Sequence, residues 1–272
     1  MKTLAGYTIL YDAECPMCGL YTQAFVKTGM LDGTGRAAYQ NMPEAACPLI
    51  DRQRAVNEIA LVNTQTGEVK YGVDSLFKVI GHAFPVFAPL FNFRPFAWLM
   101  AKAYAFVSYN RRVIIPVRAD EHALQPTFNL KYRIAFLLFS WLMVGFILTR
   151  YAHLLIGMVP IGNPYREYFI CGGQVVFQGI IALLFRKQKI GDYLGNMMTI
   201  SFAGALLLLP MLFVAKFITV PALVCVLYFM GVAGLMFLEH IRRTKILRLG
   251  WALTISWVLY RLGVLGLILY LN

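Results

Sequence analysis

The chain has 272 residues, of which 59% are hydrophobic and 14% are charged, and its mean hydropathy is +0.63. Soluble domains are about 45–50% apolar and about 25% charged, so this composition excludes an ordinary soluble protein and indicates one largely embedded in lipid. The net charge of +12 does not indicate nucleic-acid binding, because Lys and Arg concentrate in short loops between apolar segments, where they orient membrane helices.

Residues 1–83 carry the pattern of a small mixed α/β domain. YTILYD (7–12) has the composition of a strand, and a helix begins near the cysteines that follow and ends near Gly29. The remaining elements are a strand at RAAYQN (36–41), a polar helix around 44–57, strands at EIALVN (58–63) and EVKYG (68–72), and an amphipathic helix at VDSLFKVIGHAF (73–84). The order β-α-β-α-β-β-α, with C-x-x-C where the first strand meets the first helix, predicts a thioredoxin-like domain.

The C-x-x-C pair, Cys15 and Cys18, has the spacing of a redox-active dithiol. A helix N-terminus offers unpaired N–H groups and partial positive charge, which stabilise the thiolate that attacks disulfides. We expect Cys15 to be the more exposed, attacking thiol and Cys18, one turn later, to resolve the mixed disulfide. Pro16 suits the first helical turn. Asp12, which ends the strand, either carries the thiol proton or is a turn or N-cap residue.

The same pair has a competing interpretation as half of a zinc site. Structural zinc needs four ligands, commonly two close pairs, and only Cys47 and His82 offer additions. Since no second close pair follows, we expect no metal site and interpret Cys47 as an inert buried thiol. We expect no cofactor beyond the Cys15–Cys18 disulfide, which the cytosolic glutathione pool would hold mainly as the dithiol.

The motif D-x-x-C-x-x-C, at Asp12–Cys18, resembles that of the DCC family of thiol-disulfide oxidoreductases, although Ala13 stands where that family usually has glycine. Two later stretches are also similar to the family: VDSLFKVI after the last strand, and YNRRVIIP at 109–116. The resemblance covers roughly residues 7–116. It implies a thioredoxin-like fold, dithiol chemistry and Asp12, Cys15 and Cys18 as active-site residues. Asn110 and Arg111 match the family's closing segment.

A connector at 84–130 separates the redox domain from the apolar half of the chain. It is rich in aromatic residues, and prolines at 85, 89 and 95 disfavour a continuous helix across 84–107. We expect a helix from about Pro95 to Tyr109, lying either at the membrane interface, with aromatic residues towards lipid, or as a cap on the core of the first domain. A membrane-spanning helix here is the third interpretation, and it would invert the topology of everything that follows.

The remainder, 131–272, is expected to be a bundle of about five transmembrane helices. A spanning helix needs about 20 mostly apolar residues. Five segments qualify: 134–158, 168–185, 194–215, 217–238 and 249–270. The expected fold class is therefore an α/β thioredoxin-like N-terminal domain followed by an all-α polytopic membrane bundle.

Basic residues predict how this bundle is oriented. If all five spans are real, three groups fall on one side: Lys131 and Arg133, then 186–189, then 242–248. No signal-peptide pattern precedes them, because acidic residues interrupt the first apolar run. We therefore expect an integral protein of a bacterial inner membrane, with a cytoplasmic N-terminal domain and with Asn272 outside.

Arg261 stands near the middle of the last apolar segment. An isolated charge at that depth costs at least a few kcal/mol, so it should face a polar partner or a cavity. We consider Glu239, Gln174, Gln178 or the headgroup of a ligand as that partner, with snorkelling towards the membrane surface as the alternative.

These patterns together predict a membrane-anchored thiol-disulfide oxidoreductase that acts on a thiol or disulfide of another protein, itself membrane-associated. One alternative is a non-catalytic membrane scaffold whose redox-type domain serves only for docking. Another is electron transfer to a quinone across the bilayer, in which Arg261 would be functional. A thiol relay would further require Cys171 and Cys225, single cysteines of the second and fourth spans, to meet at the same depth.

Overall fold

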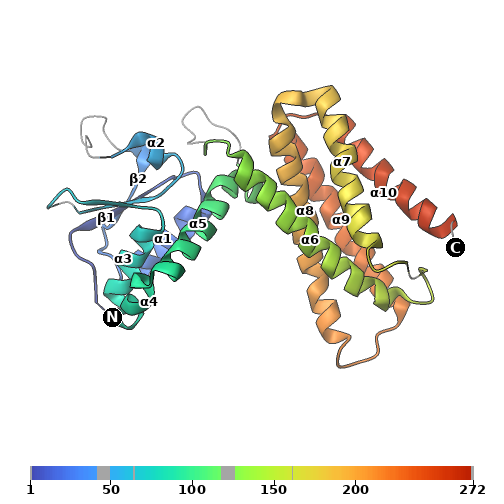
Figure 1. Cartoon of the computed structure of the whole chain (residues 1–272), viewed down its shortest axis with the longest axis horizontal. Coiled ribbons are helices and arrows are strands. Elements are labelled where there is room, and N and C mark those ends of the chain that lie inside the picture. The colour runs from blue at the N-terminus through green and yellow to red at the C-terminus, as the bar shows by residue number, and fades with distance from the viewer. Residues whose placement is uncertain (1, 42–49, 64, 118–125, 161, 271–272) are drawn as a thin grey trace. The chain divides into compact units, whose positions relative to one another are not determined.

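The computed structural model describes residues 2–41, 50–63, 65–117, 126–160 and 162–270. The chain divides into two compact units, Met1–Tyr132 and Arg133–Asn272. The first contains a small β-sheet and the second is built from helices (Figure 1). The expected combination of a mixed-sheet domain with a helical bundle is thus confirmed.

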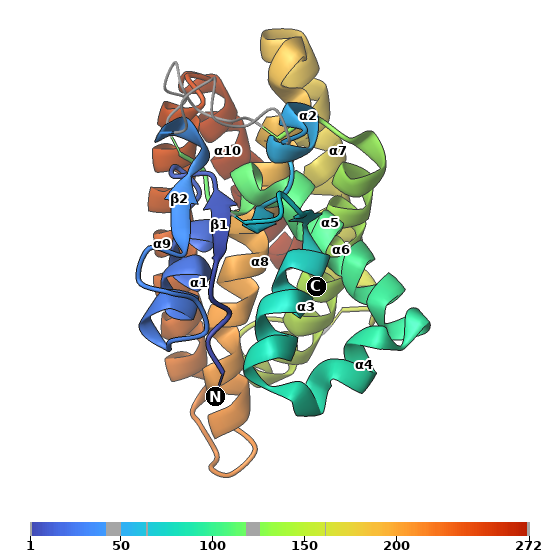
Figure 2. The same cartoon turned by 90° about the vertical axis from the view of Figure 1, so that its left-hand side faces the viewer.

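The sheet of the first unit has four strands in the order β2-β1-β3-β4. β1 is parallel to β2 and antiparallel to β3, and β4 is antiparallel to β3. The parallel pair lies side by side in Figure 2, with Ile9 opposite Arg36. The strands are β1 Tyr7–Tyr11, β2 Arg36–Ala38, β3 Ala60–Asn63 and β4 Val69–Tyr71. A parallel neighbour requires a crossover connection, and the first helix supplies it between β1 and β2.

Five helices accompany this sheet, and they bury its apolar residues. Ile9 and Leu61 from the two central strands are fully buried against Phe25 of the first helix and Val79 of the third. The helices are α1 Pro16–Lys27, α2 Arg52–Ala55, α3 Val73–Ala83, α4 Ala88–Asn92 and α5 Arg94–Ile114. The predicted β-α-β-α-β-β-α order is confirmed. The second strand is shorter than predicted because Tyr39–Asn41 turns into a 3₁₀ helix. Of the helix predicted around 44–57, residues 44–49 lie outside the described residues, and the described part is helical only at Arg52–Ala55.

Helix α5 is longer than predicted and has two different halves. Its C-terminal half is buried at Ser108, Asn110, Arg111 and Val113, so it caps the first unit as one of our interpretations required. Its N-terminal half leaves Trp98 and neighbouring apolar side chains exposed. No candidate membrane span among the described residues lies in this helix, so nothing supports the spanning interpretation.

The second unit contains five long helices. They are α6 Leu130–Ala152 (which begins in the last residues of the first unit), α7 Arg166–Arg186, α8 Ile190–Val214, α9 Ala222–Ile246 and α10 Ala252–Tyr270. Four helical stretches of the described chain are long and apolar enough to cross a membrane, and one of them, Arg166–Val214, contains α7 and α8 joined by a 3₁₀ turn at Lys187–Lys189. The protein is therefore a membrane protein by the length and composition of its helices.

Three helix junctions of the second unit that carry basic residues lie at the same end of that unit. Arg133, near the start of α6, donates from Nη1 to the carbonyl oxygen of Gly191 at 2.6 Å, next to the start of α8. Lys189, in the turn between α7 and α8, donates from Nζ to the carbonyl oxygen of Leu247, just beyond the end of α9, at 2.7 Å. The basic groups that predict the orientation are thus neighbours in space.

Two predicted helices in this unit have displaced boundaries at both ends. The first helix begins at Leu130, four residues earlier than predicted, and ends at Ala152, because a 3₁₀ turn follows at His153–Leu155. The fourth begins after Pro221 and continues to Ile246, through basic residues that the apolar pattern had excluded. Hydropathy locates the lipid-facing part of a helix, whereas the helix itself continues into polar surroundings.

Candidate functional site

The two cysteines lie where strand β1 leads into helix α1. Cys15 is the N-cap residue, with φ −93° and ψ 103°, and Pro16 occupies the first helical turn. The N-cap position directs the sulfur back over the helix, so that the backbone N–H of Cys18 donates to Cys15 Sγ at 3.4 Å. Both cysteines are free thiols. The sequence therefore places a thiol where a backbone donor already points at its sulfur.

This geometry separates the acidities of the two thiols. The pKa of Cys15 is lowered to about 6, chiefly because the Cys18 thiol donates a hydrogen bond to its sulfur; burial opposes this, while the Cys18 backbone N–H and the charge of Arg111 reinforce it. The pKa of Cys18 is raised, because its proton is held by Cys15 and because the group is buried. Both shifts have the direction that favours the thiolate at Cys15 and the protonated thiol at Cys18.

The expected exposure of Cys15 is wrong. Cys15 is 3% exposed and Cys18 is 8% exposed, so the proposed attacking sulfur is the more deeply covered of the two. The reason is the N-cap geometry itself, because a sulfur that turns back towards the helix joins the core cluster around Ile9 and Leu61. Exchange with a protein partner therefore needs a local opening at the start of α1.

Asp12 directly follows β1, three residues before Cys15, and is 2% exposed. Its Oδ2 is 3.1 Å from Nη2 of Arg111 and 2.9 Å from Nη2 of Arg112. Its Oδ1 accepts from Nε2 of Gln40 at 2.7 Å and from the backbone N–H of Glu14 at 3.1 Å. The Glu14 contact makes Asp12 a turn residue, and Cys15 is the N-cap. Both carboxylate oxygens are engaged by strong donors.

The two arginines come from the C-terminal end of α5, about a hundred residues further along the chain. Arg111 also donates to the carbonyl oxygen of Val56 at 2.9 Å, and Arg112 donates from Nη1 to the carbonyl oxygen of Glu14 at 3.1 Å. They thereby join α5 to the loop before the cysteines. The resemblance at 109–116 singled out Arg111 but not its neighbour Arg112. The sequence analysis missed Arg112 and Gln40 as site residues, because no local pattern connects them to Asp12.

Two buried tyrosines complete the surroundings of the dithiol. Burial raises the pKa of Tyr21, whose hydroxyl also bonds with the thiol of Cys18. Burial likewise raises the pKa of Tyr104 on α5, whose hydroxyl oxygen accepts from the backbone N–H of Ile59 at 3.1 Å. Both phenols therefore stay protonated, and they shield the cysteines without adding negative charge that would oppose the thiolate.

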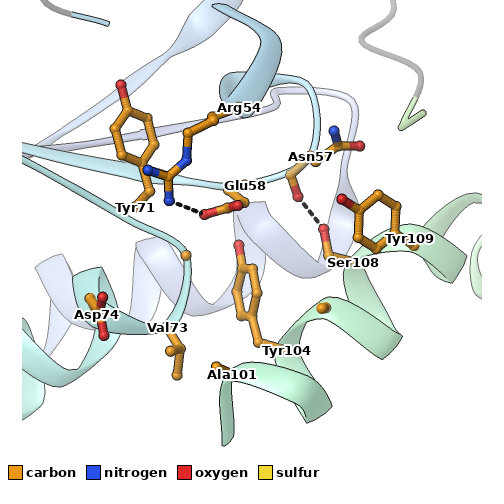
Figure 3. A pocket seen from close by; sticks show the side chains of 12 residues that line it. Arg54, Asn57, Glu58, Tyr71, Val73, Asp74, Ala101, Tyr104, Ser108 and Tyr109 are labelled. Carbon is orange, nitrogen blue, oxygen red and sulfur yellow. Dashed lines mark hydrogen bonds and ion pairs between the residues drawn. The ribbon is translucent and has the colours of Figure 1, made fainter. Parts of the chain in front are cut away.

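A cavity of about 210 Å³ opens on the other side of Tyr104 (Figure 3). Tyr104 points from α5 towards Glu58, which pairs with Arg54 at 3.1 Å, and Ser108 donates to the carbonyl oxygen of Asn57. The wall also includes residues from β4 and the start of α3: Tyr71, Gly72, Val73 and Asp74. Neither cysteine lines this cavity.

The alternative metal interpretation gains no support within the part of the chain that the structure describes. No group of three or more His, Cys, Asp or Glu side chains in this part is placed to hold a metal ion. The ring nitrogen Nε2 of His82 lies 3.2 Å from the carbonyl oxygen of Thr3, remote from the dithiol in the sequence and without a cysteine among its contacts. Cys47 lies outside the described residues.

In the helical unit, the carboxylate partner considered for Arg261 is wrong. Glu239 pairs instead with two arginines of its own helix, Arg242 at 2.6 Å and Arg243 at 2.7 Å, because spacings of three and four residues bring them to the same face. The guanidinium of Arg261 lies over the ring of Trp257, 4.2 Å from its centroid. Arg261 takes part in no ion pair among the residues that the structure describes.

The two single cysteines of this unit are both free thiols. Cys225 is buried in a core cluster of α6, α8 and α9, and Cys171 packs at the edge of that cluster. The carbonyl oxygen of Cys225 accepts from the hydroxyl of Tyr151 at 2.8 Å, so its contacts are those of a packed helix residue. Nothing in this arrangement indicates a thiol relay.

No family model, no curated protein and no solved structure matches this chain. The chemistry of the site must therefore be inferred from its own geometry.

Proposed function

We propose that this protein is a membrane-anchored thiol-disulfide oxidoreductase whose reacting groups are Cys15 and Cys18. The observation that carries the proposal is the position of Cys15 as the N-cap of α1, where its Sγ accepts from the backbone N–H of Cys18 at 3.4 Å. The hydrogen bond from the Cys18 thiol lowers the pKa of Cys15, and the charge of Arg111 acts in the same direction. A nucleophile depends on such donors, and a second thiol one helical turn away can resolve the mixed disulfide.

The reaction follows from these positions. The Cys15 thiolate attacks one sulfur of a partner disulfide, forming a mixed disulfide and releasing the partner's second sulfur as a thiolate, which takes a proton. Once Cys15 is in the mixed disulfide it can no longer hold the Cys18 proton, so that thiol becomes more acidic. The Cys18 thiolate then attacks Cys15 Sγ, leaving a Cys15–Cys18 disulfide and a fully reduced partner. Two electrons have moved to the partner, together with one proton from Cys18 and one from solvent.

Asp12 acts in this scheme as a positioning residue. Both of its oxygens are engaged by Arg111, Arg112, Gln40 and the Glu14 N–H, which leaves little capacity to collect a thiol proton. Its carboxylate instead fixes Arg111, whose positive charge favours the Cys15 thiolate. We therefore propose that Asp12 works through Arg111.

The order of elements and the position of the cysteines support a thioredoxin-like fold for the first unit. Membership of the DCC family rests on Asp12–Cys18 together with Tyr109–Pro116, and the contact between Asp12 and Arg111 joins these two stretches directly. The two stretches that resemble the family therefore contribute residues to the same ion cluster beside the dithiol.

The location proposed for the protein is a bacterial inner membrane, with the dithiol in the cytoplasm. Support comes from the three basic helix junctions, which lie at one end of the helical unit as the positive-inside rule requires of cytoplasmic loops. A cysteine added after Asn272 in a variant lacking Cys171 and Cys225 tests the orientation. We expect it to react with an impermeant maleimide in intact cells.

The decisive experiment is capture of a mixed disulfide by the full chain with Cys18→Ala. The expected result is a covalent complex with a protein partner that disappears on reduction and does not form when Cys15→Ser is added. Cys225→Ser is the matched control, because it removes a buried thiol remote from the dithiol and should leave capture intact. Because Cys18→Ala also removes the thiol that most lowers the pKa of Cys15, capture is tested up to about pH 9. Failure of both Cys18→Ala and the unaltered protein to exchange with any disulfide across this range, including a small aromatic one, would exclude the oxidoreductase.

One observation favours a different function, a membrane scaffold whose first unit only docks to a partner. Cys15 is 3% exposed, and a docking module has no need of an accessible thiol. If Cys15→Ser preserves the cellular role of the protein while removal of the helical unit abolishes it, the scaffold is the better description. Loss of the role in both variants favours the enzyme.

A further inference from the structure

Within the described residues, four buried hydrogen-bond donors without acceptors lie on two helices of the second unit that pack together. Gln174 and Gln178 are one turn apart on α7, and Trp257 and Arg261 are one turn apart on α10, so each pair shares a face of its helix. Two hydrogen bonds join these helices: Tyr260 donates to the carbonyl oxygen of Ile170 at 2.8 Å, and Ser256 donates to Oε1 of Gln178 at 3.2 Å. In Figure 1, α7 and α10 run beside each other.

The donor atoms share one property: each is buried and unpaired within the described part of the chain. They are Nε2 of Gln174, Nε2 of Gln178, Nε1 of Trp257 and Nε of Arg261. Gln174, Gln178 and Trp257 are 6%, 0% and 3% exposed. A buried donor without an acceptor costs about 1–3 kcal/mol, so four of them on two helices that pack together call for a group that supplies acceptors.

The oxygen of the Gln178 side-chain amide is hydrogen-bonded, whereas its nitrogen has no partner among the described residues. Its Oε1 accepts from the hydroxyl of Tyr193 at 2.8 Å and from Ser256 at 3.2 Å. Tyr193 is in turn 3.3 Å from Nε2 of His240, whose Nδ1 lies 3.2 Å from Oγ1 of Thr254. This network satisfies the oxygen side of the amide and leaves its NH₂ group as a fixed donor.

Arg261 adds a positive charge to these donors. It is the central residue of α10, and its guanidinium rests on the ring of Trp257. The titratable groups that act on it electrostatically are Cys171, Tyr260 and His240, and none of them is a carboxylate. A charge in the middle of a spanning helix is expected to face an opposite charge, and among the described residues the helical unit does not provide one.

We propose that Gln174, Gln178, Trp257 and Arg261 bind the anionic oxygen head of a lipid-soluble amphiphile, a carboxylate or a phosphate. Anionic oxygens are acceptors only, so they complement four donors, and their charge complements Arg261. The apolar tail would lie along the lipid-facing side chains of the same helices, among them Ile180, Leu184, Leu259 and Leu262. A neutral carbonyl head, such as that of a quinone, would supply acceptors but leave the charge of Arg261 uncompensated.

The test uses the full chain in nanodiscs of phosphatidylcholine, with oleate as the carboxylate probe, dioleoyl phosphatidate as the phosphate probe and methyl oleate as the neutral control. We expect one or both anionic probes to raise the thermal midpoint and methyl oleate to leave it unchanged. Whichever anionic probe acts identifies the source of the head, a free fatty carboxylate or a phospholipid. Dibromostearate should quench the protein's fluorescence through Trp257, so the quenching should decrease in Trp257→Phe.

Variants locate the binding. Arg261→Gln should weaken the effective anionic probe about 10- to 100-fold, because it removes a charge-assisted interaction, and Arg261→Lys should weaken it less. Arg242→Gln, an exposed arginine of α9, is the matched control and should bind normally. If Arg261→Gln does not fold, Gln174→Leu, which removes one donor and keeps the charge, should still weaken binding about tenfold.

Three results would overturn the proposal: stabilisation by methyl oleate or decyl-ubiquinone equal to that by the anionic probes, no stabilisation by either anionic probe, or undiminished binding by the foldable variants at Arg261 and Gln174. The dithiol is not involved, so Cys15→Ser should bind both anionic probes as the unaltered protein does. The amphiphile site and the oxidoreductase therefore succeed or fail separately.

Discussion

The two units of this protein treat buried charge in opposite ways. In the first unit, the carboxylate of Asp12 receives two guanidinium groups, one side-chain amide and one backbone N–H. In the second unit, Arg261 rests on an aromatic ring and has no ion pair among the described residues. The charge of Asp12 is thus paired within the chain, whereas that of Arg261 has no opposite charge among the described residues.

The difference indicates what each charge is for. A buried charge that is completely paired holds elements together, and here it joins the loop before the cysteines to the end of α5. A buried charge that the chain leaves unpaired is stable only when something else pairs it. Arg243 shows that the helical unit can pair an arginine when required, since it donates to Glu239 at 2.7 Å and to Asn196 at 2.9 Å.

The largest effect is expected from removal of the paired anion. Asp12→Ala leaves Arg111 and Arg112 buried beside each other without their shared counter-ion, and breaking a buried pair in this way costs about 3–5 kcal/mol. Hydrogen–deuterium exchange of strand β1, Tyr7–Tyr11, in the full chain measures the loss as faster exchange.

A matched control is Lys70→Ala, which removes the exposed ion pair with Glu68 at 3.2 Å and leaves the hydrogen bond from Tyr7 to Glu68 in place. Exposed pairs contribute little, so exchange of β1 should not change measurably in this variant. If Asp12→Ala exchanges as slowly as Lys70→Ala, the ion cluster is not what holds α5 against the redox site.

Smaller effects on stability are expected within the helical unit, and they should have opposite signs at two arginines, Arg243 and Arg261. Arg243→Met removes a paired cation and leaves Asn196 without its donor, so it should destabilise by about 1–2 kcal/mol. Arg261→Met in lipid-free detergent removes an unpaired charge and should stabilise by about 1 kcal/mol or more. Thermal unfolding followed by circular dichroism compares the two, and destabilisation by both would mean that Arg261 is satisfied within the chain.

Local patterns in the sequence predicted the elements around the dithiol well. The strand predicted at 7–12, the helix predicted to begin near the cysteines and the amphipathic helix predicted at 73–84 are confirmed, as Tyr7–Tyr11, Pro16–Lys27 and Val73–Ala83. Each depends on neighbours only a few residues away. The N-cap position of Cys15 follows from the same local chemistry. Its burial does not, since that depends on packing against strands and helices far along the chain.

The partners of charged residues were predicted least well. Asp12 and Arg111 are separated by 99 residues, and no periodicity connects them; only the family resemblance had placed both in one domain. Glu239 was considered as a partner for Arg261 because both are charged residues of the apolar half. Arg242 and Arg243, three and four residues away on the same helix, compete for it with far less loss of conformational freedom.

A third effect, of about 1 kcal/mol, tests the network that fixes Gln178. Tyr193→Phe removes the hydroxyl that donates to Gln178 Oε1 at 2.8 Å and keeps the ring that packs in the core. Tyr228→Phe is the control, because its hydroxyl bonds at an exposed position to the carbonyl oxygen of Leu207. The thermal midpoint should fall more in Tyr193→Phe, and equal decreases would show that Gln178 is not held by this bond.

The smallest expected effect is a shift in the pKa of Cys15. Its direction should differ between variants of Arg111 and Asp12, which carry opposite charges. The rate of alkylation by iodoacetamide should rise as pH passes about 6 and then level off, because the pKa of Cys15 is lowered from its ordinary value by Cys18 and, to a lesser extent, by Arg111.

Cys18→Ala should move this transition to higher pH most strongly, Arg111→Gln should move it slightly in the same direction, and Asp12→Asn should move it slightly to lower pH. Each variant changes one contribution to the free energy of the thiolate: the hydrogen bond, the favourable charge and the unfavourable charge. A transition near pH 9 in the unaltered protein would show that backbone and Cys18 donors do not stabilise the thiolate, and the sheet unit would then hold a buried dithiol without a nucleophile.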